Sequence, residues 1–250
     1  MKRFISTILF LFVLVMAKAE LSDSLKMAND LYAANEIGKA IKAYESIIDS
    51  GYESAALYFN LGNAYYKNND LVDAILNYER AKKLAPRDED IQFNLDLLNQ
   101  FVIDKIEPLP QPFFVKWGNS FINWLRTDTW AIISLAAFIL ALILGLGYAF
   151  LRNVSLRKTA FTVGVVALLI SIMSFAFAVK QRSDSLHKQS AIIFSPSVTV
   201  KASPNENSVD LFVIHEGLKV HVVQNRNYWL EIKLDDGNQG WIQKDALKII

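Results

Sequence analysis

The chain has 250 residues, 52% of them hydrophobic and 20% charged, and its 26 basic and 25 acidic residues give a formal net charge of +1. Such a hydrophobic excess is typical of membrane-embedded sequence, and the near-neutral charge gives no general affinity for nucleic acid. The absence of cysteine excludes disulfides, thiolate nucleophiles and cysteine-ligated metal, and only three histidines remain for catalysis. The composition therefore favours a non-enzymatic, membrane-anchored interaction protein without a cofactor.

Residues 1–19 carry the pattern of a secretory signal peptide. Two basic residues precede the apolar stretch Phe4–Met16, and small residues at Ala17 and Ala19 mark a cleavage site. The alternative is an uncleaved anchor, although Phe4–Met16 is short for a membrane span of about 20 residues. In either case we expect the following segment to be exported.

Residues 20–106 contain an internal repeat with a period of 34. Asn35 aligns with Asn69 and Tyr44 with Tyr78, and a third copy begins near Phe93. The middle copy has the order Tyr58, Leu61-Gly62, Tyr65, Ala74, Tyr78, Ala81 and Pro86. This period and order resemble the tetratricopeptide repeat (TPR) family, whose unit is a helix–turn–helix.

The repeat pattern also predicts local structure. Gly62 and Ala74 are small, which is expected where the two helices of one repeat approach closely, and Asn68-Asn69-Asp70 is the predicted turn between them. The last copy has only its first helix, and we expect roughly residues 88–103 to form a solvating cap.

The TPR resemblance implies peptide binding on the concave face that the first helices line. The candidate protein-binding residues are Asn29, Tyr32, Phe59, Asn63, Tyr66, Lys67, Phe93, Leu97 and Gln100. Aromatic side chains there would supply contact area, while asparagine and lysine would bind backbone or carboxylate groups. A carboxylate clamp is not expected, because the basic residues of the family's clamps are missing. The alternative is that this face packs on a neighbouring domain or on the chain's own interfacial helix.

Residues 107–129 combine a Pro-rich linker with an aromatic segment. Trp117, Phe121 and Trp124 recur at three- and four-residue spacing, which predicts a helix in the membrane interface. The alternative is a short helix packed on the repeats.

Two uncharged apolar runs follow, and we predict transmembrane helices over 130–151 and 161–179. Each is long enough to cross a hydrocarbon core of about 30 Å. An exported N-terminus places the basic loop 152–160 in the cytoplasm, so the two helices form a hairpin that returns the chain to the outer side. Gly145 and Gly147 are expected to let the helices approach closely.

Residues 190–250 change to the alternating pattern of β-strands, with about five short strands predicted. Trp229 and Trp241 are expected to supply much of the core of so small a domain. The segment Val200–Pro204, the Gly217 turn, and the strands around both tryptophans resemble the bacterial SH3-like (SH3b) family, which implies a small barrel. His215 and His221 are expected on its surface, with no carboxylate placed to orient either.

The order of these parts resembles the E-type proteins of the Bacteroides aerotolerance (Bat) operon. The resemblance implies an inner-membrane scaffold with periplasmic TPR and SH3-like domains, membrane lipid around its hairpin, and a role in stress or oxygen tolerance. The implied partners are Bat proteins with von Willebrand factor A domains and a MoxR-type AAA+ ATPase. The predicted fold class is multi-domain: an all-α TPR array, a two-helix transmembrane hairpin and a small all-β SH3-like barrel. The alternative function is peptidoglycan attachment through the barrel; an enzyme is disfavoured, because no set of nucleophile, base and orienting group is recognisable.

Overall fold

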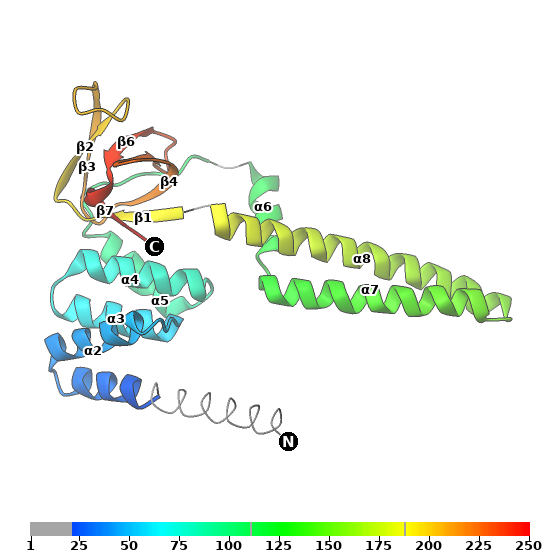
Figure 1. Ribbon diagram of the computed structural model, residues 1–250. Helices are drawn as coiled ribbons and strands as arrows, with labels where there is room; N and C mark the ends of the chain where they lie inside the picture. The colour runs from blue at the N-terminus through cyan, green and yellow to red at the C-terminus, as the bar shows by residue number, and fades with distance from the viewer. Residues whose placement is uncertain (1–21, 111, 188) are drawn as a thin grey trace, which may run out of the picture. The chain divides into compact units, whose positions relative to one another are not determined.

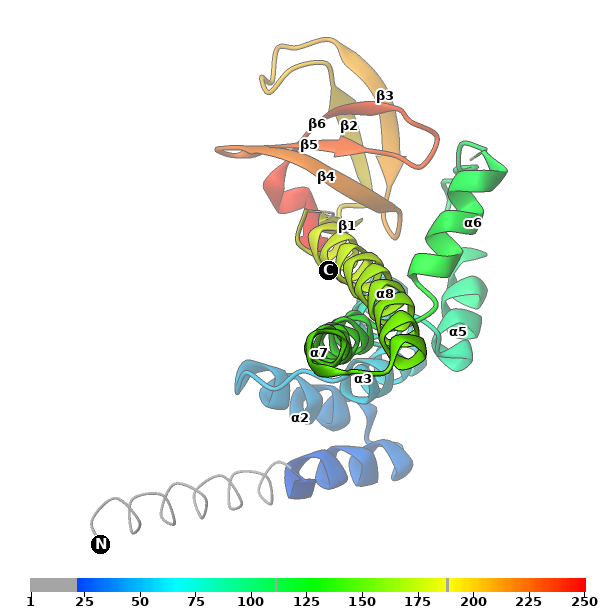
Figure 2. The same ribbon diagram turned by 90° about the vertical axis from the view of Figure 1, so that its right-hand side faces the viewer.

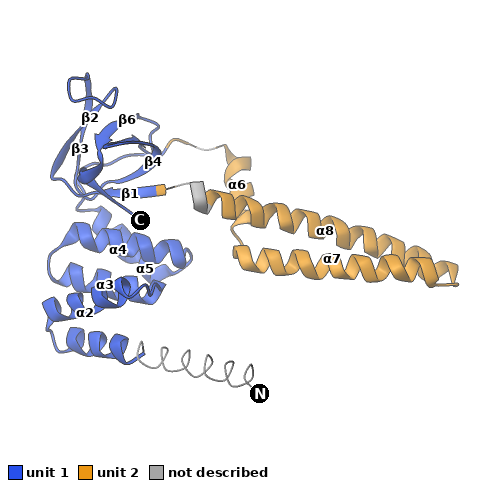
Figure 3. Ribbon diagram, in the orientation of Figure 1, with its two compact units in different colours: residues 1–108, 190–250 blue, residues 109–189 orange. Residues whose placement is uncertain are grey.

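The computed structural model describes residues 22–110, 112–187 and 189–250, and the chain divides into two compact units (Figures 1 and 3). Unit 1 comprises Met1–Pro108 and Ser190–Ile250, and unit 2 comprises Leu109–Gln189. The predicted signal peptide lies outside the described residues. The predicted fold class is confirmed, because a helical array, a pair of long apolar helices and an antiparallel all-β domain follow one another in this order.

The helical array contains a helical segment over 22–33, then α2 (Ile37–Asp49), α3 (Ala55–Lys67), α4 (Leu71–Leu84) and α5 (Glu89–Asn99). Side chains cap two of these helices, because Ser54 Oγ accepts the Leu57 N–H and an Asp88 carboxylate oxygen accepts the Ile91 N–H. Helices α2 and α4 begin at residues 37 and 71, and helices α3 and α5 begin at residues 55 and 89, so both pairs reproduce the period of 34.

The turn within each repeat depends on an asparagine in the left-handed region. Asn35 and Asn69 have φ of 63° and 66°, and the residue after each donates its N–H to a carbonyl five residues earlier. Glycine or asparagine commonly ends a helix in this way. The predicted turn at residues 68–70 is therefore confirmed.

Gly62 is required by the close packing of α3 on α4. A Cβ added there would lie 2.8 Å from two ring carbons of Tyr78. The predicted close approach of the two helices is confirmed, and its contact is the Tyr78 ring, which is buried in the helical core.

The β domain is a strongly curved sheet (Figure 2) with the strand order β3-β2-β6-β5-β4-β1-β7. Its strands are β1 (Gln189–Ile193), β2 (Ser197–Lys201), β3 (Asp210–His215), β4 (Lys219–Arg226), β5 (Trp229–Lys233), β6 (Gln239–Gln243) and β7 (Leu247–Ile249). The paired strands β1–β7, β2–β3, β2–β6, β4–β5 and β5–β6 are antiparallel.

The core of the β domain is aliphatic, so the prediction that tryptophans supply much of it is wrong. Val200, Ile214, Val220, Ile232 and similar residues fill it. Trp229 remains partly exposed, and Trp241 is buried outside this cluster, with the Arg226 guanidinium 6.0 Å from its ring centroid. On β5 the pleat turns Leu230 and Ile232 inward instead.

Unit 1 is held together because the β domain packs on α4 and α5 (Figure 1). Ile192 of β1 is fully buried in the helical core, while its neighbour Ile193 faces the core of the β domain. Polar contacts surround this shared core: Lys219 Nζ lies 2.5 Å from a Glu79 carboxylate oxygen, and Arg80 donates to the Ile249 carbonyl at 3.1 Å. The segments that precede and follow unit 2 in the sequence therefore pack together into a single compact unit.

The segment after α5 also ties the helices to the β domain. Val102 packs against both hydrophobic cores. Asp104 accepts the backbone N–H of His215 at 2.6 Å, and its other carboxylate oxygen lies 3.0 Å from His215 Nδ1.

Unit 2 contains α6 (Phe113–Ile122), α7 (Thr127–Phe150) and α8 (Val154–His187), of which α7 and α8 lie side by side and antiparallel (Figures 1 and 2). Thr127 pairs with Gln181 at one end, and the Tyr148 and Phe161 rings meet at the other. Midway, the hydroxyls of Ser134 and Ser171 each donate to the other residue's carbonyl, at 3.0 and 2.9 Å.

Small residues line the face of α8 that packs on α7. They recur at alternating spacings of four and three: Ala160, Gly164, Ala167, Ser171, Ser174 and Ala178. A Cβ on Gly164 would lie 3.4 Å from Leu144 Cβ, whereas one on Gly145 would meet nothing within 4 Å and one on Gly147 only the nearby Leu151. The prediction that Gly145 and Gly147 permit the close approach is therefore wrong.

Within the residues that the structure describes, two helices are long and apolar enough to cross a membrane. They cover Thr127–Phe150 and Val154–Asp184, with mean hydropathies of 2.5 and 2.4, and most of each apolar stretch is exposed.

Candidate protein-binding face

An asparagine at the centre of each described repeat accepts two hydrogen bonds. In the first repeat, Tyr44 Oη of α2 donates to Asn29 Oδ1 at 2.7 Å, and Asn60 Nδ2 of α3 donates to the same oxygen at 3.1 Å. The network therefore links the first helix of a repeat to its second helix and to the first helix of the next repeat.

The same network recurs 34 residues later. Tyr78 Oη of α4 donates to Asn63 Oδ1 at 2.6 Å, and Asn94 Nδ2 of α5 donates to it at 3.3 Å. An amide oxygen has two lone pairs, so Oδ1 of Asn29 and of Asn63 is satisfied. Neither Nδ2 group makes a hydrogen bond within the described residues. Each network thus holds an amide in a fixed orientation with its donor group still available.

The tyrosines of these networks stay protonated over a wide pH range. Burial, with a smaller contribution from Tyr32, raises the pKa of Tyr44 to about 12. Burial likewise raises the pKa of Tyr78 well above its usual value. Because both hydroxyls keep their protons at neutral pH, they remain donors to the asparagines.

Aromatic and basic side chains flank the asparagines. Lys67 Nζ lies 5.1 Å from the Tyr32 ring centroid, which joins the first helices of the two repeats by a cation–π contact. Tyr66 is 41% exposed. Phe59 differs, because its ring lies 5.7 Å from that of Tyr78 and it packs against the helical core. Of these four, Phe59 is the one engaged in packing between α3 and α4.

The third copy presents the remaining candidate residues on α5 and at the C-cap position that follows it. Phe93 is 68% exposed, Gln100 is exposed and Leu97 is half-buried. Phe93 is the repeat equivalent of Phe59, but no second helix covers it within the described part of the chain. Phe101 and Ile103 are exposed as well, so this end of the array presents apolar side chains beside its exposed polar ones.

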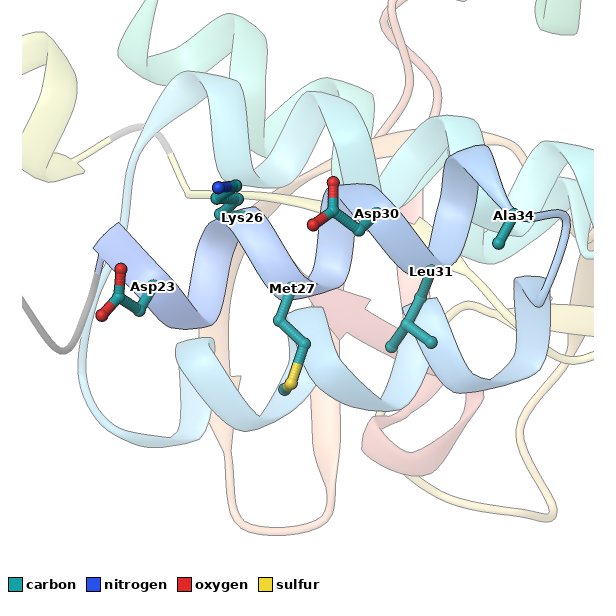
Figure 4. Close-up of a pocket in the computed structure, with 6 residues that line it drawn as sticks. All are labelled: Asp23, Lys26, Met27, Asp30, Leu31 and Ala34. Carbon is teal, nitrogen blue, oxygen red and sulfur yellow. The ribbon is translucent and has the colours of Figure 1, made fainter.

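A separate open depression lies along the helical segment 22–33 (Figure 4). Its volume is about 480 Å³, and its lining residues are Asp23, Lys26, Met27, Asp30, Leu31 and Ala34. None of the candidate binding residues contributes to it. Because one helix supplies the whole lining, the depression does not enclose a small molecule.

Both histidines of the β domain contact carboxylates, so the expectation that none is placed to orient them is wrong. His215 pairs with Asp104, and His221 Nε2 lies 2.9 Å from Asp235 Oδ1 with Ser190 Oγ 3.2 Å from its Nδ1. Asp104 lies 111 residues before His215, so no sequence pattern could have identified this pair. The described residues contain no group of three or more histidine, aspartate or glutamate side chains that could hold a metal ion.

Comparison with known proteins identifies the repeats. Residues 25–89 match the model of the tetratricopeptide repeat family, and such repeats indicate a scaffold for protein–protein interaction. No curated protein matches the chain. Among solved structures, an NlpC/P60 family protein from Bacillus cereus ATCC 10987 aligns with 13% identity and a TM-score of 0.22. That alignment covers 28% of this chain and 23% of the other.

Proposed function

We propose that this chain is a membrane-anchored scaffold that binds a segment of a protein partner on the face formed by Asn29, Asn63, Tyr66, Lys67 and Phe93. The observation that carries the proposal is the repeated asparagine network, because each network leaves one oriented amide donor on the first helix of its repeat. No catalytic step is proposed.

The chemistry of this face suits a peptide backbone. The Nδ2 groups of Asn29 and Asn63 can donate to carbonyl oxygens, which every peptide presents whatever its side chains. Tyr66 and Phe93 add exposed aromatic area, which gives most of the affinity in interfaces of this kind. Lys67 favours an acidic or carboxylate group on the partner.

The test is a binding measurement with the double variant Tyr66→Ala and Phe93→Ala in the full chain. Both side chains are exposed, so we expect intact folding and a loss of partner binding of about tenfold or more, as for interface hot spots. The matched control is Leu84→Ala, an exposed apolar residue on α4 outside this face. Unchanged binding by the double variant contradicts the proposal.

Membrane anchoring is supported by unit 2. Leu142, Ile143, Leu146 and many other large apolar side chains of α7 and α8 are exposed, far beyond the apolar patches that soluble proteins present. The shared core of unit 1 adds an independent argument. The helical array and the β domain pack together, so they must lie on the same side of a membrane, and the segment that joins them must cross it an even number of times. A hairpin of two spans meets that requirement.

Single-cysteine variants test this topology, since the chain has no cysteine of its own. Phe101→Cys places an exposed thiol just after the helical array, and Tyr228→Cys places one on the β domain. Arg152→Cys places a third between α7 and α8. An impermeant maleimide added to spheroplasts is expected to label the first two, and to label position 152 only after permeabilisation. Labelling at only one of positions 101 and 228 in intact spheroplasts contradicts the hairpin.

The resemblance to Bat-operon proteins supports a more specific assignment. The chain would sit in a bacterial inner membrane with unit 1 in the periplasm, and would bind Bat-type proteins with von Willebrand factor A domains and the MoxR-type ATPase system in oxygen or stress tolerance. Crosslinking from position 66, followed by identification of the trapped protein, tests the partner. Capture of an unrelated protein contradicts the Bat assignment while leaving the scaffold role intact.

Peptidoglycan attachment through the β domain is the second candidate. The exposed Leu211, Val213 and Tyr228 offer contact surface on this domain. Because Ile192 belongs to the helical core, the sedimentation test with purified sacculi uses the full chain in detergent. Tyr228→Ala is expected to reduce sedimentation, and a chain that stays in solution rules this candidate out.

A further inference from the structure

Helix α6 carries four aromatic side chains on one face. At 100° per residue, Phe113, Phe114, Trp117 and Phe121 fall on one side. Asn119 and Val115 fall opposite them, and Lys116 and Ser120 lie at the border beside Phe113. Three of the aromatic side chains extend into solvent, with exposures of 84% for Phe113, 62% for Phe114 and 74% for Trp117. This face is apolar and largely uncovered by the rest of unit 2.

The remaining aromatic residue joins α6 to the apolar hairpin. The Phe121 ring lies 6.3 Å from that of Trp130 on α7 and 5.8 Å from that of Phe177 on α8. Trp130 Nε1 donates to the Ile122 carbonyl at 2.8 Å, and Gln181 Nε2 donates to the same carbonyl at 2.7 Å and to the Leu125 carbonyl at 2.9 Å. These contacts fix α6 at the end of the hairpin where α7 begins and the apolar part of α8 ends.

The position and charge of α6 are those of a helix at a lipid–water boundary. Phe121 contacts the hairpin and lies on the same side of α6 as the exposed aromatic residues. The aromatic side of α6 is therefore continuous with the apolar surface of α7 and α8. Residues 108–126 contain no acidic residue, and Lys116 and Arg126 supply positive charge. Aromatic side chains with nearby lysine and arginine are typical of the headgroup region.

We infer that α6 lies in the headgroup region of the bilayer that α7 and α8 cross, with Phe113, Phe114 and Trp117 inserted at the boundary with the acyl chains. The inference rests on the proposed membrane anchoring. Because Gln181 and Trp130 hold α6 to the hairpin, the helix sets the depth at which the hairpin sits.

The test measures depth in the bilayer with a single fluorescent label. Three full-chain variants, Trp117→Cys, Leu142→Cys and Tyr228→Cys, are labelled with an environment-sensitive fluorophore and reconstituted in phosphatidylcholine–phosphatidylglycerol vesicles. All three side chains are exposed, so the substitutions disturb little packing. The vesicles contain lipids that carry a quenching nitroxide either near the headgroup or near the acyl end.

We expect the label at position 117 to lose more fluorescence to the shallow nitroxide, the label at 142 to lose more to the deep nitroxide, and the label at 228 to lose none. A label at 117 that escapes quenching, or that is quenched as deeply as the one at 142, overturns the inference but leaves membrane anchoring intact. A label at 142 that escapes quenching contradicts the anchoring itself.

Discussion

Replacing Ile192 by alanine should destabilise helices that lie almost 100 residues earlier in the chain. Ile192 belongs to β1, yet its side chain is fully buried in the core formed by α4 and α5. Its truncation therefore removes apolar contacts from the helical array, although the residue itself belongs to a strand of the β domain.

The expected size follows from this burial. Truncation of a buried isoleucine to alanine costs about 2–5 kcal/mol, because a cavity remains where the side chain was. A mid-range loss of about 3 kcal/mol lowers the Tm by roughly 6–12 °C in a unit of this size. Total stabilities are about 5–15 kcal/mol, so the variant should stay folded at room temperature.

Amide hydrogen exchange of the full chain in detergent measures the effect segment by segment. We expect protection to fall in α4 and α5 together with the strands, and to remain unchanged for the control Val223→Ala, whose side chain is exposed on β4. Reduced protection confined to the strands would refute the shared core.

Four further substitutions test the repeats. Gly62→Ala places a Cβ 2.8 Å from the Tyr78 ring and should destabilise the array by about 1–3 kcal/mol, whereas Gly38→Ala, with nothing within 4 Å, should stabilise it by about 0.5–1 kcal/mol in thermal unfolding. Tyr78→Phe should cost about 0.5–1.5 kcal/mol in chemical denaturation, because Asn63 Oδ1 loses one of two donors. Burial raises the pKa of Tyr44 from 10.0 to about 12, so the unfolded chain ionises first. Stability is then complete below pH 10 and falls as the pH rises towards about 12, and denaturation at several pH values should show a smaller fall in Tyr44→Phe.

The repeats could be predicted from the sequence because their determinants are local and occur twice. Asn35 and Asn69 end their helices by the same backbone conformation, and Gly62 is small because Tyr78 is large. The asparagine network is also periodic, since Tyr44 and Tyr78 align. The alignment does not give the direction of each hydrogen bond. In the structure the tyrosines donate to Oδ1 of Asn29 and Asn63, which leaves the Nδ2 group of each asparagine available as a donor.

The contacts between distant segments could not be predicted. Strand β1 shows no alternation in the sequence because Ile192 and Ile193 are both buried, one against helices and one in the β domain. Gly164 was missed for a related reason. A glycine matters in a helix pair only where the partner approaches, and the sequence alone does not give the rotation of α8 about its axis.

The burial of Ile192 among α4 and α5 also has a consequence for biosynthesis. The ribosome completes α5 at Asn99 and must add 93 further residues before it reaches position 192. At about 5–20 residues per second this takes roughly 5–20 s, during which both long apolar helices are also synthesised. Throughout that delay the array exposes the apolar surface that β1 will cover.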